Sequence, residues 1–122
     1  MTNLEIYQGA LSLTGDRPSS HGADYEERAT LIIPIVSQAL APIDRLLKRF
    51  LGKPPVPINE FSCTLEENSP LEENLFACAC HYLASELTAF EDAELSNLLF
   101  IRAEALRRSL FESIPYEIKK IK

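Results

Sequence analysis

Apolar side chains recur at intervals of three and four residues over most of this chain, which is the spacing of amphipathic helices. The first such stretch begins after Thr2. Glu5 lies three residues further on, the spacing of a capping box in which each side chain bonds the other's backbone N–H. Gly15 tolerates a left-handed backbone and ends the stretch. The pattern therefore predicts a helix over Asn3–Thr14.

The longest apolar pattern begins near residues 23–24 and ends at Gly52. Pro34 and Pro42 lie inside it, and each removes a backbone donor and crowds the preceding turn. The apolar phase nevertheless continues across both prolines, which predicts one long, kinked helix rather than two shorter ones. The apolar positions assigned to this helix are Tyr25, Ala29, Ile32, Val36, Ala39, Ile43, Leu46, Leu47 and Phe50.

A proline-rich connection follows over residues 53–68. Its first part, residues 53–57, holds three prolines and must be extended. Residues 58–65 alternate only weakly between apolar and polar side chains. They predict a short strand at most, and no sheet is expected.

The third helical stretch opens on Ser69, which precedes Pro70 at the first helical position. Glu72, three residues after the serine, completes a second capping box. The pattern predicts a helix from there to about Phe90. Its centre, residues 75–84, is apolar nearly all round, so this helix is expected to be the central and most buried one.

The fourth helix follows Asp92, a favourable cap, and is predicted from Ala93 to about residues 112–113. The turn before it is very short, so the last two helices are expected to form an antiparallel hairpin. The predicted fold is all-α: a small bundle of about four helices with a long kinked second helix and a C-terminal hairpin. Residues 1–113 are assigned to a single domain, and residues 114–122 to a tail that is a candidate docking arm.

The overall composition of the chain is less informative than its charge. The net charge is -6, which opposes general affinity for nucleic acid. Residues 1–100 carry 6 Lys and Arg against 15 Asp and Glu, whereas residues 101–122 carry 6 against 3. Such a polarised chain can place its basic end against an acidic surface of a second copy, although charges also scatter unevenly in any short chain.

Three cysteines, an odd number, predict a reduced, intracellular protein. No run of about 18 apolar residues is present, so no membrane span is predicted. The first residues lack a basic segment ahead of an apolar one, so no secretory signal is expected either.

The sequence Cys78-Ala79-Cys80-His81 is the one segment that suggests a metal site. Zinc needs ligands that converge on a tetrahedral centre. On a helix, however, Cys78 and Cys80 point about 200° apart. Cys78 and His81 share a face, but two ligands do not make a site. Buried core cysteines are therefore the preferred interpretation, and no metal or other cofactor is predicted.

No catalytic residue is predicted either. Ser19, Ser20 and His21 lack a strained strand–helix turn around them. The four glycines never cluster, so no phosphate-binding loop is expected. Arg102, Arg107 and Arg108 form the one basic cluster. It lacks the interleaved aromatic residues of a nucleic-acid patch, so a solvated helix end is the preferred interpretation. The candidate subunit or partner interface comprises Arg102, Arg107, Arg108, Ile118, Lys119 and Lys120.

Several short segments in combination carry a likeness to a known family. They are Ala10-Leu11-Ser12-Leu13-Thr14-Gly15, Tyr25-Glu26-Glu27-Arg28-Ala29, Pro70-Leu71-Glu72-Glu73-Asn74-Leu75, Ala79-Cys80-His81-Tyr82-Leu83-Ala84-Ser85-Glu86-Leu87, Asp92-Ala93-Glu94-Leu95-Ser96-Asn97 and Arg102-Ala103-Glu104-Ala105-Leu106. Over about residues 3–112 the chain resembles the head–tail connector (adaptor, or head-completion) proteins of tailed bacteriophages and prophages.

This resemblance implies a viral structural protein and not an enzyme. It implies a ring of about twelve copies beneath the portal protein, which extends the DNA channel and meets a tail or stopper protein. The implied location is the head–tail junction of the virion, and the host cytoplasm during assembly. Neither sequence-specific nucleic-acid binding nor membrane binding is expected. The alternative is a cellular helical regulatory or adaptor module that binds a partner protein in a groove.

Overall fold

Helices form the regular structure of this chain in the computed structural model, which describes residues 1–15, 23–58 and 61–120. The helices are α1 (Asn3–Thr14), α2 (Ala23–Leu51), α3 (Phe76–Thr88), α4 (Ala93–Ser113) and α5 (Tyr116–Lys119), and a 3₁₀ turn (Glu73–Leu75) leads into α3. Within those described ranges no strand is formed, only an isolated bridge between Thr2 and Asn68. The predicted all-α fold is confirmed.

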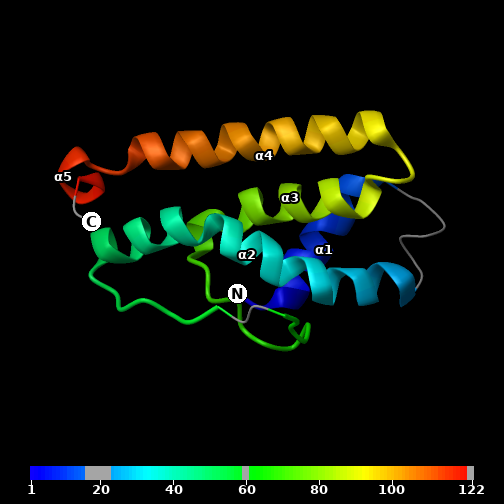
Figure 1. Ribbon diagram of the computed structural model, residues 1–122, viewed down its shortest axis with the longest axis horizontal. Coiled ribbons are helices and arrows are strands. Elements are labelled where there is room, and N and C mark those ends of the chain that lie inside the picture. The colour runs from blue at the N-terminus through cyan, green and yellow to red at the C-terminus, as the bar shows by residue number, and fades with distance from the viewer. Residues whose placement is uncertain (16–22, 59–60, 121–122) are drawn as a thin grey trace.

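The central position of α3 is also confirmed. It packs against α1, α2 and α4, and α4 returns antiparallel beside it, so the two helices form the predicted hairpin (Figure 1). Its buried side chains face all three neighbours and include Cys78, Ala79, Cys80, Leu83, Ala84 and Leu87. The bundle is elongated because α2, α3 and α4 all run along its long axis (Figure 1).

α1 begins with the predicted capping box. The backbone N–H of Glu5 donates to Thr2 Oγ1 at 3.2 Å, and the N–H of Thr2 donates to Glu5 Oε1 at 3.1 Å. Gly15 follows the helix with φ of 78°, a conformation that a side chain would strain. The sequence sets both ends of this helix locally. Tertiary hydrogen bonds add to its start, because the N–H groups of Asn3 and Leu4 donate to the carbonyls of Glu67 and Leu65 at 2.9 and 2.8 Å.

α2 runs as one helix through Pro34 and Pro42, as the unbroken apolar phase predicts (Figure 1). Its buried stripe is shifted slightly from the predicted one, because Ile33 and Leu40 lie in the core and Ala39 is exposed. The buried row is Tyr25, Ala29, Ile33, Val36, Leu40, Ile43 and Leu47. This row advances evenly by three and four residues and so stays on one side of a helix.

The start of α3 differs from the prediction. Ser69 and Glu72 do not form a capping box, and the α-helix begins only at Phe76. Glu72 is extended, with φ of -67° and ψ of 148°. The hydroxyl of Ser69 accepts instead from the N–H of Leu71 at 3.2 Å. The reason lies outside the segment, in the charged partners that hold Glu72.

The hydrophobic core continues beyond residue 113, the predicted end of the domain. Ile114 is 2% exposed and belongs to the core. α5 then turns back toward α2, where Arg49 Nη1 donates to the carbonyl of Ile118 at 3.3 Å. Ile118 is half-buried against the core. The described part of the tail therefore lies against the domain at the end where α2 finishes.

Candidate interaction surface

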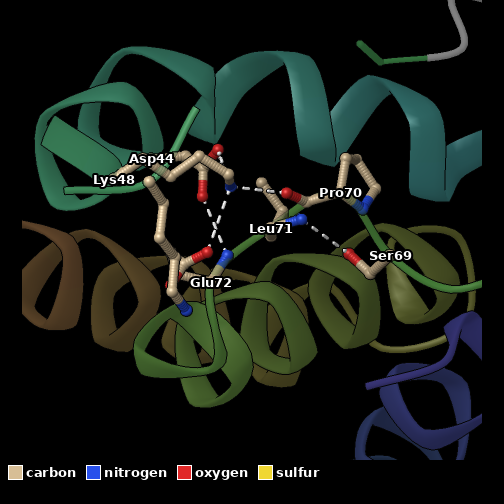
Figure 2. A network of polar contacts seen from close by, with 7 residues as sticks. Asp44, Lys48, Ser69, Pro70, Leu71 and Glu72 are labelled. Carbon is tan, nitrogen blue, oxygen red and sulfur yellow. Dashed lines mark hydrogen bonds and ion pairs between the residues drawn. The ribbon is translucent and has the colours of Figure 1, made fainter. Parts of the chain in front are cut away.

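A buried network of ion pairs joins α2 to the segment before α3 (Figure 2). Lys48 Nζ lies 2.6 Å from Asp44 Oδ2 and 3.3 Å from Glu72 Oε2, and it donates to the carbonyl of Pro70 at 2.6 Å. Asp44 Oδ1 accepts from the N–H of Glu72 at 2.8 Å. Only 3% of the Lys48 side chain and 4% of the Asp44 side chain are exposed. Lys48 thus has three oxygen partners, which match its three N–H bonds.

Glu72 also meets Lys53, whose ammonium lies 2.9 Å from Oε1. Burial on its own would raise the pKa of Glu72, but the hydrogen bonds from Lys53 and Lys48 outweigh it and lower the pKa. Because the folded pKa is lowered, this carboxylate stabilises the fold above its unfolded pKa of about 4.3, and the contribution is lost as the pH falls through the folded value. This network holds the connection in place against α2.

The cysteines point in different directions, as helical geometry predicts. The thiol of Cys78 donates to the carbonyl of Ala103 on α4 at 3.3 Å, and that of Cys80 to the carbonyl of Ile6 on α1 at 3.5 Å. Burial raises the pKa of each to about 12. Across residues 1–15, 23–58 and 61–120, no three His, Cys, Asp or Glu side chains are grouped to hold a metal ion. His21 lies outside those residues.

These surroundings predict the order of thiol labelling. Cys63 is half-buried with a pKa raised to about 11, chiefly by burial, whereas Cys78 and Cys80 are buried. At about pH 8 we expect a thiol reagent to modify Cys63 first and the other two only after denaturant is added. Absorbance of the released chromophore measures this, and Cys63→Ser is the control that removes the early phase. Rapid native labelling of that variant would contradict the burial of the other two thiols.

The candidate residue Arg107 is engaged within its own subunit. Its Nη2 donates to Glu104 Oε2 at 2.8 Å, its Nε donates to the hydroxyl of Tyr82 at 3.2 Å, and that hydroxyl donates to Glu104 Oε1 at 2.7 Å. The hydrogen bond from Arg107 is the main cause that lowers the pKa of Glu104, while burial is the main cause that raises the pKa of Tyr82 to about 12. This closed triangle ties α4 to α3.

The triangle forms part of a groove of about 260 Å³ between α2 and α4. Ile35, Val36 and Ala39 line it from α2, and Phe100 lines it from α4. The ring of Tyr82 contacts that of Phe100 edge to face, with centroids 5.9 Å apart. The walls are apolar, and at the rim Glu104 and Arg107 already bond each other. Such a groove suits an apolar side chain of a partner better than a reacting substrate.

The other candidate residues lie on different sides of the molecule. Arg102 and Arg107 project about 140° apart around α4, so they do not form one patch. Arg102 and Arg108 are exposed. In α5, Lys119 Nζ lies 4.7 Å from the ring centroid of Phe111, and Lys120 Nζ lies 5.7 Å from that of Tyr116. Ile118 faces the core, whereas Tyr116, Glu117 and Lys120 are exposed and Lys119 is half-buried.

Exposed apolar side chains are the feature that the sequence pattern missed. α4 has 21 residues, but only Leu99 and Ala103 are buried. Large side chains at least 44% exposed occur on both long helices: Leu31, Ile35, Phe50, Leu51, Leu98, Phe100, Ile101 and Phe111. A polar outer face would have been expected of a surface helix. One sequence signal could have revealed this surface: α4 has more apolar residues than packing against α3 alone can bury.

By length and composition alone, α2 is long and apolar enough to cross a membrane. The core helix of a soluble protein can share these properties, and 44% of the most apolar part of α2 is buried inside the bundle. Asp44 and Lys48, paired on its inner face, belong to the protein core rather than to a lipid-facing surface. The buried apolar side chains of α2 pack mainly on α3, while Leu31, Ile35, Phe50 and Leu51 remain exposed.

The chain matches no protein-family model, no curated protein and no solved structure.

Proposed function

We propose that this chain is a structural subunit of a tailed bacteriophage or prophage, a head–tail connector that forms a ring beneath the portal, and that it is not an enzyme. The observation that carries the proposal is the apolar surface of α4. Leu98 and Ile101 lie on one flank of this helix, and Phe100 and Phe111 lie on another about 120° away. These four side chains are 44–55% exposed.

Two separate apolar flanks on one helix suit a subunit that contacts different neighbours on different sides. A ring subunit makes such heterologous contacts, in which one face meets a different face of the next copy. Exposed apolar patches are uncommon on proteins that act alone. The likeness over about residues 3–112 to connector proteins supports the same function. The acidic charge of the chain also suits a channel through which DNA passes without being held.

The test uses the full chain and its genetic neighbours. We expect the gene to lie among portal, capsid and tail genes, and the tagged chain to co-purify with the portal protein encoded beside it. Electron microscopy of that complex is expected to show a ring of this chain beneath the portal. A gene among metabolic or regulatory neighbours, together with no binding to any portal protein, would contradict the proposal.

The groove between α2 and α4 favours the second candidate, a regulatory or adaptor module that receives one helix of a cellular partner. In that case Phe100→Ser should abolish capture of the partner, because this ring forms part of the groove wall. Ile101→Ser, on the other flank, is the matched control and should leave capture unchanged. Equal losses from both substitutions would favour the connector, whose ring contacts use both flanks.

Removal of residues 118–122 tests the tail. We expect the truncated chain to remain folded, because Ile114 stays in the core, but to lose roughly 1 kcal/mol of stability with the half-buried Ile118. We also expect weaker assembly, because Lys119 and Lys120 are lost. Urea denaturation and light scattering measure the two effects separately. Unchanged assembly would show that the tail is no docking arm.

A further inference from the structure

The charges of this molecule are separated along its long axis. α2 and α4 begin, and α3 ends, at one end of the bundle (Figure 1), where Arg28 Nη2 donates to the carbonyl of Glu86 at 3.1 Å. We call this end the acidic pole. Its exposed carboxylates are Asp24, Glu26, Glu27, Glu86, Glu91 and Glu94. Arg28 lies among them, 3.8 Å from Asp24.

The opposite end, where α2 and α4 finish and α5 lies, is the basic pole (Figure 1). Its cations are Arg45, Arg49, Arg108, Lys119 and Lys120. Glu73, Glu112 and Glu117 are interspersed with them, so the excess of positive charge is smaller than the excess of negative charge opposite. The two poles carry opposite net charge on the same chain.

Each pole also presents apolar surface at its tip. Phe90, between α3 and α4 at the acidic pole, is 95% exposed. At the basic pole Phe50, Leu51, Phe111 and Tyr116 are 44–69% exposed. An apolar centre with charged residues around it is the usual composition of a protein interface, and an aromatic side chain is the commonest anchor.

We infer that the acidic pole of one copy binds the basic pole of the next, with Phe90 seated among the apolar side chains of the basic pole. The partner is a second copy of this chain because the two poles complement each other in charge and lie at opposite ends, so one molecule cannot pair its own. Such head-to-tail contacts close into a ring or extend as a filament. The inference rests on the self-association part of the proposed function.

Charge-reversed full-length chains test the contact. Variant X carries Glu26→Lys, Glu91→Lys and Glu94→Lys, and variant Y carries Arg45→Glu, Arg108→Glu and Lys120→Glu; all six side chains are exposed. X has two basic poles and Y has two acidic poles. We expect each alone to self-associate at least about tenfold more weakly than the natural chain. An equimolar mixture of X and Y should regain association, because opposite poles meet again.

Sedimentation velocity is the measurement, with circular dichroism to verify folding. Association of the natural chain should weaken as salt rises from about 0.1 M to about 1 M, where the Debye length falls from about 10 Å to about 3 Å. A natural chain that stays monomeric, variants that associate like it, or a mixture that does not recover would each overturn the inference. If the chain binds the portal but not itself, this inference fails while the proposed function stands.

The apolar anchor has its own test. Phe90→Ala should leave the midpoint of urea unfolding unchanged, because the side chain is already 95% exposed, yet weaken self-association about tenfold. Phe61→Ala is the matched control, since Phe61 is 83% exposed on the connection between α2 and α3. It should affect neither quantity. Equal effects of the two substitutions on association would exclude Phe90 as the anchor.

Discussion

Replacement of Lys48 by Met is expected to destabilise the fold by about 3–5 kcal/mol, because it leaves a buried charge without its partner. Asp44 is 4% exposed and would lose the ammonium that lies 2.6 Å away. The carbonyl of Pro70 would lose its donor as well. Urea denaturation at neutral pH measures the loss. The methionine itself fits the position, since it keeps the apolar length of the lysine stem.

Lys53→Met is the control for this prediction. Lys53 bonds the same Glu72, but 56% of its side chain is exposed, so its loss is expected to cost less than about 1 kcal/mol. Adding Asp44→Asn to Lys48→Met should recover part of the stability. The amide oxygen can still accept from the N–H of Glu72, and the buried carboxylate that lacks a cation is gone. A loss below about 1 kcal/mol for Lys48→Met would show that the network contributes little to stability.

The pH dependence of the unfolding free energy separates the effect of the lost charge from the effect of lost packing. In the natural chain the lowered pKa of Glu72 means that its stabilisation falls as the pH drops below the unfolded value of about 4.3. In Lys48→Met the carboxylate of Glu72 keeps only Lys53 as a charged partner, so less stabilisation is lost in acid. The difference in unfolding free energy between the two chains should therefore narrow over the acid range below about pH 4.3. A constant difference over that range would point to lost packing instead.

This network also explains where sequence reasoning fails. Ser69, Pro70 and Glu72 satisfy every local rule for a helix start, yet the helix begins at Phe76. Local rules treat Glu72 as free to reach back to Ser69, whereas Lys48 and Lys53 of another segment hold it. The spacing of Asp44 and Lys48, one turn apart in α2, indicates an ion pair but not that it is buried. Long-range partners of this kind cannot be read from a window of sequence.

Where local chemistry decides, sequence reasoning succeeds. The capping box at Thr2, the cap at Asp92 and the glycine stop at Gly15 all lie within a few residues of the ends they fix. The same holds for α2, whose apolar phase predicts one helix through both prolines. The exposed apolar residues on α4 were not predicted, because a pattern of apolar positions does not distinguish a buried face from one that awaits a partner.

The close contact between α1 and α3 follows from small residues, and it predicts the effect of Gly9→Ala. On an exposed helix this change would stabilise by about 1 kcal/mol, since alanine favours the helix. Here a Cβ on Gly9 would lie 2.5 Å from Cys80 Sγ and 3.0 Å from Phe76 Cζ. We expect the crowding to prevail and the variant to be destabilised by about 1–3 kcal/mol.

A double-mutant cycle decides whether that contact is the cause. Cys80→Ala removes the sulfur and leaves a small cavity, so on its own it should also destabilise the fold. In that background Gly9→Ala should be neutral or stabilising, because its methyl group enters the space that the sulfur has left. The coupling between the two sites, measured by urea denaturation, should then be about 1–3 kcal/mol. Additive losses would show that α1 can move aside, and that close packing against Cys80 does not fix the distance between these helices.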